Sequence, residues 1–496
     1  MEELLVGLNF PSKFVNWIMM CLKGTSYTIM LNGRLHGKFQ GKKGLRQGDL
    51  MSPLLSFLTM EYLSRRLKKE TTKTIFRFHP MCKGLNLVSL CFADDLILFS
   101  KGSPMGVHHL KIALESFSEV TGLFPNKYKS LVYFGGVSTG DKMVILEDLH
   151  MGEGTFPLKY LGVPLRPTKW RREDCETIIK KVKLRLETWA TRYLSYAGRV
   201  QLIHSILFGL RNYWMSIFIL PQSVIKEVEK LCRGFLWGFK GEKSKIHLAF
   251  WDLVCLPKPF GGLGFKNGPT WNRSILGKFI WAIMDKHDIL WVKWVNNIYM
   301  KGVDFWEYEL KGDVSWYWRK MCHLRKRYTR LNVLAAVKKG KFIAARLYMG
   351  TIQRSIDNFY KSVWCNVSLP KHRFIMWQVV HGNLLTKDNF AKFHIALESC
   401  ICPVCGMEEE SHSHIFFNCR LSKEVLQLVF SWCGAELWPS DFTRWKVWLA
   451  NSKASVRIHL AAATVYMVWK NRNSCVDNNC CYTKLRIVNS IKESQV

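Results

Sequence analysis

The sequence predicts an α+β protein built from several domains, and three observations lead to this fold class. Short β-prone runs with turn signals lie within the first hundred residues, whereas residues 171–240 carry a helical and basic pattern. Residues 400–419 gather Cys and His at spacings typical of metal ligands. The chain of 496 residues is long enough for two to four domains, and its 48% hydrophobic content lets each bury a core.

The charge of the chain constrains its partners. The sequence has 72 Lys and Arg against 38 Asp and Glu, a formal net charge of +34, which indicates a polyanionic partner such as nucleic acid or an anionic membrane surface. The membrane alternative is weaker, because no run reaches about 18 uninterrupted apolar residues. The start Met1-Glu2-Glu3 is acidic where a secretory signal needs basic residues. We therefore expect an intracellular protein that binds RNA and DNA and does not span a membrane.

Sixteen Cys without a signal sequence favour free thiols and metal ligands in a reducing compartment over a disulfide scaffold. Cys21, Cys91, Cys232 and Cys255 stand singly among apolar residues. We expect these four side chains to pack in hydrophobic cores.

The first 60 residues alternate between helical and extended patterns. A helical apolar pattern over 14–21 precedes a β-rich run at 27–31, which ends in Asn32-Gly33 and so predicts a hairpin. A loop rich in Gly and Lys then spans 41–49. After it, Ser52-Pro53 predicts a helix start with Ser52 as N-cap.

Two adjacent carboxylates lie at a second predicted hairpin. The runs 87–92 and 96–99 are β-prone, and Asp94 and Asp95 stand between them, before a helix predicted from about Val107. Repulsion disfavours paired carboxylates unless a cation offsets it, and Mg²⁺ prefers a few carboxylates plus substrate phosphates. A solvated turn is the competing interpretation.

A second constellation has the spacing of a zinc site. Cys402-x2-Cys405-x8-His414-x4-Cys419 supplies four ligands of the types that enclose a structural Zn²⁺ ion. His412 and Cys400 lie close by and compete for the same roles.

Several motifs, in order, resemble those of reverse transcriptases of the non-LTR, LINE-type group, especially plant ones. Phe92-Ala93-Asp94-Asp95 resembles the metal-binding hairpin of that family, and the Cys/His pattern resembles the zinc-binding domain that follows the polymerase. Further similar segments are Gly44-Leu45-Arg46-Gln47-Gly48-Asp49, Gly122-Leu123 to Ser130, Tyr160-Leu161-Gly162-Val163, Phe235-Leu236-Trp237-Gly238 and Gly261-Gly262-Leu263-Gly264.

The resemblance implies a role for each matching residue. Asp94 would be the principal Mg²⁺ ligand and Asp95 an auxiliary one, in a two-metal nucleotidyl transfer. The remaining assignments are Arg46, Gln47, Gly48 and Lys129 for template and nucleotide binding, Leu161 and Gly162 for the primer grip, and Cys402, Cys405, His414 and Cys419 for zinc.

The family places another catalytic carboxylate on a strand before the loop that matches Gly44 to Asp49 here, but the first Asp of this sequence is Asp49. We therefore expect an N-terminally truncated, catalytically impaired derivative. The expected organisation is a partial right-hand polymerase palm (1–137), a primer-grip and helical thumb-like region (138–240), a Trp-rich, mostly helical connecting region (241–360), a small zinc-binding domain (361–450) and a C-terminal tail (451–496).

Two functions remain open at this point. The first is an RNA-directed DNA polymerase of a transposable element, located in the nucleus or cytoplasm, with Mg²⁺, Zn²⁺ and deoxynucleotides as its small-molecule requirements. The alternative is a non-catalytic nucleic-acid-binding zinc protein derived from a retroelement. An incomplete gene model without a stable product is a third interpretation.

Overall fold

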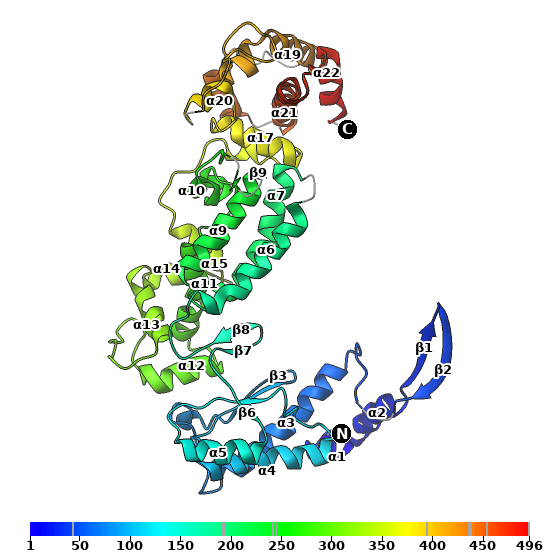
Figure 1. Ribbon diagram of the computed structural model, residues 1–496, viewed down its shortest axis with the longest axis vertical. Helices are drawn as coiled ribbons and strands as arrows, with labels where there is room; N and C mark the ends of the chain where they lie inside the picture. Colours follow the sequence, from blue (N-terminus) through cyan, green and yellow to red (C-terminus); the bar gives the residue numbers. More distant parts are fainter. Residues whose placement is uncertain are drawn as a thin grey trace. The chain divides into compact units, whose positions relative to one another are not determined.

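The computed structural model describes residues 1–494 except 42–43, 191–193, 241–242, 245, 393–394, 435–438, 440 and 453–454. The chain forms two compact units (Figure 1). Unit 1 contains Met1–Arg166 and Ile283–Glu309, and unit 2 contains Pro167–Ala282 and Leu310–Val496. The mixture of helices and small sheets confirms the α+β class.

Unit 1 combines helices with two-stranded sheets, of which β5–β6 is parallel and the others are antiparallel. Its elements are α1 (Glu2–Gly7), α2 (Ser12–Lys23), β1 (Ser26–Leu31), β2 (Arg34–Gln40), α3 (Ser52–Thr71), η1 (Lys83–Leu85), β3 (Ser89–Phe92), β4 (Asp95–Leu98), α4 (Pro104–Thr121), β5 (Leu131–Val132), α5 (Thr139–Leu149), β6 (Gly152–Glu153), β7 (Leu158–Tyr160), β8 (Val163–Leu165), α12 (Leu290–Val295) and η5 (Asn296–Met300).

Local sequence signals explain several of these boundaries. Asn32 and Gly33 have φ of 50° and 78°, so the β1–β2 hairpin turns where the sequence predicted. The Ser103 side chain accepts a hydrogen bond from the Gly106 N–H at the start of α4, and Gly122 ends that helix with φ of 71°.

The prediction that Ser52 caps α3 was wrong. The helix already includes Ser52, and Met51 is the N-cap. The Ser52 hydroxyl instead donates a hydrogen bond of 2.6 Å to the Arg46 carbonyl oxygen, so the side chain fastens the preceding loop to the helix.

Unit 1 buries its apolar residues in small, separate clusters. One cluster joins α3, the β3–β4 hairpin and α4, and another joins α1, α2 and the start of α3. Residues 283–309, assigned from sequence to the connecting region, are part of unit 1. The Trp294 indole donates a 2.8 Å hydrogen bond to the Met81 carbonyl.

Cys21 and Cys91 in unit 1 are exposed, so their predicted burial was wrong. Each stands on an element that buries its apolar residues on one face only.

Unit 2 is mostly helical. Its elements are η2 (Glu173–Cys175), α6 (Glu176–Ala190), α7 (Tyr196–Leu202), η3 (Ile203–Leu207), α8 (Phe208–Met215), α9 (Gln222–Trp237), β9 (Phe239–Lys240), β10 (Lys243–Ser244), α10 (Trp251–Cys255), η4 (Lys258–Phe260), α11 (Gly268–Met284), α13 (Trp316–His323), η6 (Leu324–Lys326), α14 (Arg330–Ala335), β11 (Val337–Lys338), β12 (Lys341–Phe342), α15 (Ala344–Gly350), α16 (Tyr360–Val363), α17 (Pro370–Val380), α18 (Lys387–Lys392), η7 (His414–Asn418), α19 (Arg420–Cys433), α20 (Phe442–Asn451), α21 (Ser455–Asn478) and α22 (Lys484–Glu493).

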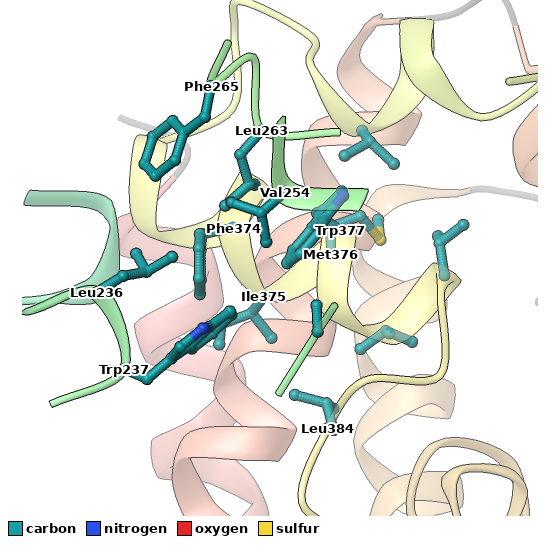
Figure 2. Packing of buried hydrophobic residues seen from close by; sticks show 14 of the residues in the cluster. Leu236, Trp237, Val254, Leu263, Phe265, Phe374, Ile375, Met376, Trp377 and Leu384 are labelled. Carbon is teal, nitrogen blue, oxygen red and sulfur yellow. The ribbon is translucent and has the colours of Figure 1, made fainter. Parts of the chain in front are cut away.

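One large hydrophobic core organises unit 2 (Figure 2). It joins α7, α9 and the segment around α10 to α17 and α21, and Cys232 and Cys255 are buried in it as predicted. Trp377 is fully buried, and its indole N–H donates a 2.8 Å hydrogen bond to the Gly261 carbonyl. At Gly262 a Cβ atom would lie 2.0 Å from the Leu256 carbonyl oxygen, so only glycine fits there.

Residues 451–496, expected to form a tail, contain the helices α21 and α22. Both pack with α19 in a cluster that includes Val425, Leu460 and Ile487. Cys475 in the last turn of α21 forms a disulfide with Cys481, which follows the helix, although the sequence favoured free thiols. The described part of the chain contains no helix that is both long and apolar enough to cross a membrane.

Candidate functional sites

The β3–β4 hairpin presents the paired carboxylates at its tip. Phe92 and Asp95 are the last cross-strand pair, so Ala93 and Asp94 form the turn, and both Asp side chains are exposed. Ala93 has φ of 51°, a left-handed conformation that residues with a Cβ adopt only at a cost in free energy. Backbone strain of this kind is concentrated at functional sites in proteins.

A second hairpin lies within electrostatic range of this tip. Partial burial raises the pKa of the Tyr160 hydroxyl, and the negative charges of Asp95 and Cys91 raise it further. Tyr160 ends β7, and the turn that follows contains Leu161 and Gly162, with φ of 49° and 75°. Tyr160, next to the predicted primer-grip turn, therefore lies within electrostatic range of Asp95 in the predicted metal-binding hairpin.

The loop before α3 exposes three of the four residues predicted to bind template and nucleotide, Arg46, Gln47 and Gly48. Gly48 has φ of 88°, which explains the glycine at this position. Lys129 is also exposed, in a turn where its N–H donates to Asn126. No hydrogen bond or ion pair found among the described residues joins this loop or Lys129 to Asp94, and their roles stay predictions.

The four residues predicted to bind zinc converge in unit 2. The ligand atoms of Cys402, Cys405, His414 and Cys419 all lie within 4.8 Å of one another. Among the described residues this is the only group of three or more Cys, His, Asp or Glu side chains placed to hold a metal ion. The composition, three Cys and one His, is that of a closed structural zinc site.

The backbone around the cluster explains this convergence. The Cys402 carbonyl accepts a 2.9 Å hydrogen bond from the N–H of Gly406, which has φ of 68°, so the Cys-x2-Cys segment closes into a tight turn. The fourth residue, Cys419, is the N-cap of α19. Hydrogen bonds from Cys402 and from backbone N–H groups at the helix start lower the pKa of Cys419, and they favour the thiolate that metals bind.

Glu408 orients the histidine of the cluster, a role the sequence analysis missed. The Glu408 carboxylate lies 2.8 Å from His414 Nδ1, and His414 Nε2 lies 3.3 Å from Cys405 Sγ. A carboxylate on one ring nitrogen leaves the other nitrogen to face a metal, as in many zinc proteins. An acidic residue three positions after the second Cys was the available sequence signal.

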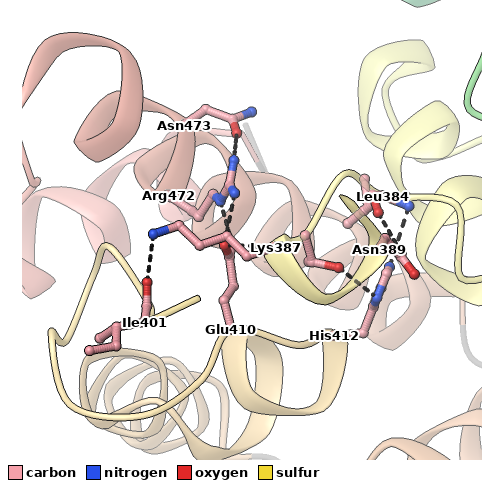
Figure 3. Close-up of polar contacts among 9 residues, drawn as sticks. Leu384, Lys387, Asn389, Ile401, Glu410, His412, Arg472 and Asn473 are labelled. Atoms are coloured by element: carbon pink, nitrogen blue, oxygen red, sulfur yellow. Dashed lines mark hydrogen bonds and ion pairs between the residues drawn. The ribbon is translucent and has the colours of Figure 1, made fainter. Parts of the chain in front are cut away.

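A buried ion pair connects the metal-binding loop to α21 (Figure 3). Glu410 and Arg472 form two hydrogen bonds, of 2.5 Å and 2.9 Å, and both residues are buried. Glu410 also accepts a hydrogen bond from the Lys387 N–H. The pair is separated by 62 residues in sequence, so no local pattern could have predicted it.

The competing ligands lie outside the cluster. The His412 ring accepts a hydrogen bond from the Leu384 N–H and contacts the Thr386 hydroxyl at 3.3 Å (Figure 3). Cys400 is exposed. Neither residue belongs to the group of four whose ligand atoms lie within 4.8 Å of one another.

Comparison with known proteins finds one family match over each segment that contains these two sites. Residues 4–165 match the model of the reverse transcriptase (RNA-dependent DNA polymerase) family, and residues 342–425 match the model described as zinc-binding in reverse transcriptase. The second match differs in its limits from the 361–450 predicted for the zinc domain, whose boundaries stay a prediction.

Similar proteins include retrovirus-related Pol polyproteins of two insects. The first, from the type-2 retrotransposable element R2DM of Drosophila melanogaster, is 24% identical over 294 residues, 56% of this chain and 26% of the relative. The second, from the type-1 element R2 of Popillia japonica, is 34% identical over 83 residues, 17% and 13% respectively.

A putative ribonuclease H protein of Arabidopsis thaliana is 33% identical over 140 residues, 28% of this chain and 23% of the relative. The chain thus spans about a quarter or less of the length of each of these relatives. The two family matches and the retrotransposon relatives together show that this chain is similar to non-LTR retrotransposon reverse transcriptases, with a second similarity to their zinc-binding domain over residues 342–425.

Proposed function

We propose that this chain is a retroelement-derived, RNA-directed DNA polymerase module that binds RNA and DNA and has lost most of its catalytic power. The observation that carries the proposal is the strained β3–β4 turn with Asp94 and Asp95 exposed at its tip, inside the segment that matches reverse transcriptases. The net charge of +34 supports a polyanionic substrate.

Mg²⁺ fits the donor set at this tip, since carboxylates and substrate phosphates are its usual ligands. When bound, Mg²⁺ ions activate the primer hydroxyl and stabilise the leaving pyrophosphate. In this proposal Asp94 is the principal ligand, Asp95 assists it, and the exposed backbone around Gln47 and Gly48 approaches the incoming nucleotide. The turn at Leu161 and Gly162 would hold the primer end.

The same tip supports catalytic impairment. Two-metal transfer needs several converging carboxylates, and within the described residues no third acidic, Cys or His side chain joins Asp94 and Asp95 in a metal-binding group. Alignment and charge stabilisation supply most of the rate in phosphoryl transfer, so this deficit should reduce the rate by several orders of magnitude. The same observation favours the second candidate function, a non-catalytic nucleic-acid-binding zinc protein.

Zn²⁺ fits the cluster of three Cys and one His in unit 2, and we propose Cys402, Cys405, His414 and Cys419 as its ligands. In this scheme 1–137 is part of a palm, 138–240 a thumb-like region, and 241–360 a connecting region. The zinc-binding domain, predicted for 361–450, would rest on α21 through the pair of Glu410 and Arg472, and on α22 through the apolar cluster with α19.

A primer-extension assay with the 496-residue chain tests the proposal. With an RNA template, a DNA primer, Mg²⁺ and deoxynucleotides, we expect binding without efficient extension. Asp94→Asn should leave binding unchanged, as should Glu119→Gln, a control at an exposed carboxylate on α4. Robust Mg²⁺-dependent extension that is abolished by Asp94→Asn alone would show that the centre is complete. Absence of binding to both RNA and DNA would refute the nucleic-acid function itself.

A further inference from the structure

A hairpin outside the two sites described above has three lysines at its tip. Strands β11 and β12 pair Val337 with Phe342 and Lys338 with Lys341, so these two lysines stand directly opposite each other. The turn between them is Lys339-Gly340, with φ of 50° and 66°, and all three lysines are exposed. We call residues 337–342 the lysine hairpin.

Lysines at these positions do not stabilise the hairpin. Like charges directly opposite in an antiparallel pair are destabilising, and β-branched or aromatic residues suit such positions better. A left-handed conformation is also unfavourable for Lys339, where Asn or Gly is usual. A segment that is both strained and self-repelling indicates a function that needs its charge.

The surrounding sequence strengthens this inference. Residues 314–356 contain eleven Lys and Arg and no Asp or Glu, although the average for the chain would place about three acidic residues in a stretch of that length. The positive charges of this stretch act on His323 in α13. Partial burial lowers the pKa of His323, and the charges of Lys320 and Lys326 lower it further.

Hydrogen bonds to neighbouring helices hold the lysine hairpin and the segment before it in place. The Tyr328 hydroxyl lies 3.0 Å from the Ser274 hydroxyl in a buried hydrogen bond, which ties the segment to α11. Arg346 of α15 donates a 3.2 Å hydrogen bond to the Val337 carbonyl and so supports the hairpin. The positive surface is therefore a fixed feature of unit 2.

We propose that the lysine hairpin binds the phosphodiester backbone of the nucleic acid. This inference rests on the proposed function and adds a specific surface to it. A lysine ammonium group interacts with a phosphate as a point charge, and a phosphate contact carries no information about the base sequence. The lysine hairpin would therefore position RNA or DNA without sequence preference. Phosphates between Lys338 and Lys341 would also relieve their repulsion. The tip, Lys-Lys-Gly-Lys, has no apolar side chain to insert into a bilayer, which disfavours a membrane surface as partner.

The test compares two triple variants of the full chain that change net charge equally. The hairpin triple is Lys338→Gln, Lys339→Gly and Lys341→Gln, in which glycine suits the turn. The control triple is Lys180→Gln, Arg444→Gln and Lys484→Gln, which removes exposed cations that already pair with carboxylates at 3.2, 3.4 and 3.0 Å. Affinity for a labelled 30-nucleotide RNA and for the same DNA is measured between 50 and 200 mM salt.

For the hairpin triple, we expect the slope of log affinity against log salt to fall by about two, and affinity at 150 mM salt to drop at least about tenfold. The control triple should change affinity less than about twofold. The hairpin triple should melt at or above the temperature of the parent chain, because it loses repulsion. Equal losses on RNA and DNA would assign the surface to the shared backbone, and a loss on RNA alone would assign it to RNA strands.

If the slope of log affinity against log salt is the same for the two triple variants, the proposal is wrong. Binding of both variants to anionic phospholipid vesicles is measured as well. A hairpin triple that binds such vesicles less tightly but binds RNA and DNA as the parent chain does would also overturn the proposal. If the hairpin triple melts at a lower temperature than the parent chain, the single variant Lys341→Gln serves as the test. Its slope of log affinity against log salt should be smaller than that of the parent by about 0.7, and an unchanged slope refutes the assignment. A parent chain that binds neither RNA nor DNA would instead refute the proposed function on which the inference rests.

Discussion

Unit 1 and unit 2 bury their apolar residues in different ways. Unit 1 holds its hairpins together with small clusters and leaves large apolar side chains exposed, among them Leu54, Phe57 and Met30, each about 70% exposed. Unit 2 has a much larger core around Trp377, a second cluster where α19, α21 and α22 meet, and a polar connection between its metal-binding loop and α21. Motif residues at the exposed hairpin tips of unit 1 are therefore candidates for binding substrate or metal ions. Motif residues such as Gly262 in unit 2 instead allow close packing of the core.

The largest expected effect is loss of the metal from unit 2. Cys402→Ser should abolish zinc binding and destabilise unit 2 by several kcal/mol, because structural zinc contributes on the order of 10 kcal/mol to small domains. Metal analysis and thermal melting of the full chain measure this. The exposed Cys400→Ser is the control and should retain about one Zn²⁺ per chain. A parent chain with far less than one Zn²⁺, or equal melting of both variants, would contradict the zinc assignment.

Breaking the buried ion pair should cost nearly as much. Glu410→Gln or Arg472→Met leaves one charge buried without its partner, so each should lower the free energy of unfolding by about 3–5 kcal/mol. The double variant, Glu410→Gln with Arg472→Met, should lose less free energy of unfolding than the sum of the losses of the two single variants. The exposed pair of Arg444 and Asp441 is the control, and Arg444→Gln should cost under about 1 kcal/mol. Equal small losses at both pairs would mean that α21 does not support the metal-binding loop.

Unit 2 should also lose stability in mild acid through His372. Burial lowers the pKa of this histidine to about 4, and its side chain has no solvent exposure. Since the unfolded chain binds a proton near pH 6.5, stability is full above that value and declines as the pH falls toward 4, by up to about 3 kcal/mol. Denaturation of the parent and of His372→Phe at pH 7.5 and 5 measures the difference. A parallel pH dependence in both proteins would exclude His372 as the cause.

The smallest expected effect concerns the exposed face of unit 1. Phe57→Ser and Leu54→Ser remove apolar side chains that are 71% and 68% exposed, so each should change the free energy of unfolding by less than about 0.5 kcal/mol. Trp377→Ala in the core of unit 2 serves as the reference and should cost about 3–5 kcal/mol. A loss above about 2 kcal/mol at Phe57 would show that this face is covered in solution.

Sequence predicted those features whose causes are local. Asn32-Gly33 specifies a turn through its own φ preferences, and the Cys-x2-Cys spacing brings two sulfurs to one side of a tight turn. These signals were sufficient for the β1–β2 hairpin and the four-residue cluster.

Features that depend on distant partners escaped prediction. Arg472 meets Glu410 across 62 residues, and α21 is buried nearly all round, so it shows no amphipathic stripe that would separate it from a tail. Cys21 and Cys91 sit among apolar neighbours in sequence, yet they point to a face that unit 1 leaves open. The roles of Asp94, Gln47 and Lys129 remain predictions, because they concern ligands.

The span of the unit 2 core in sequence has a consequence for biosynthesis. Its members run from Val182 to Trp469, and the Trp377 indole meets a carbonyl 116 residues earlier. A nascent chain therefore cannot complete this core until α21 has left the ribosome, and until then the apolar faces of α9 and α17 lack part of their cover. Non-local contacts of this kind slow folding and expose apolar surface to aggregation. Release of the chain at residue 425, where the zinc-binding family match ends, should thus give a fragment that depends on chaperones.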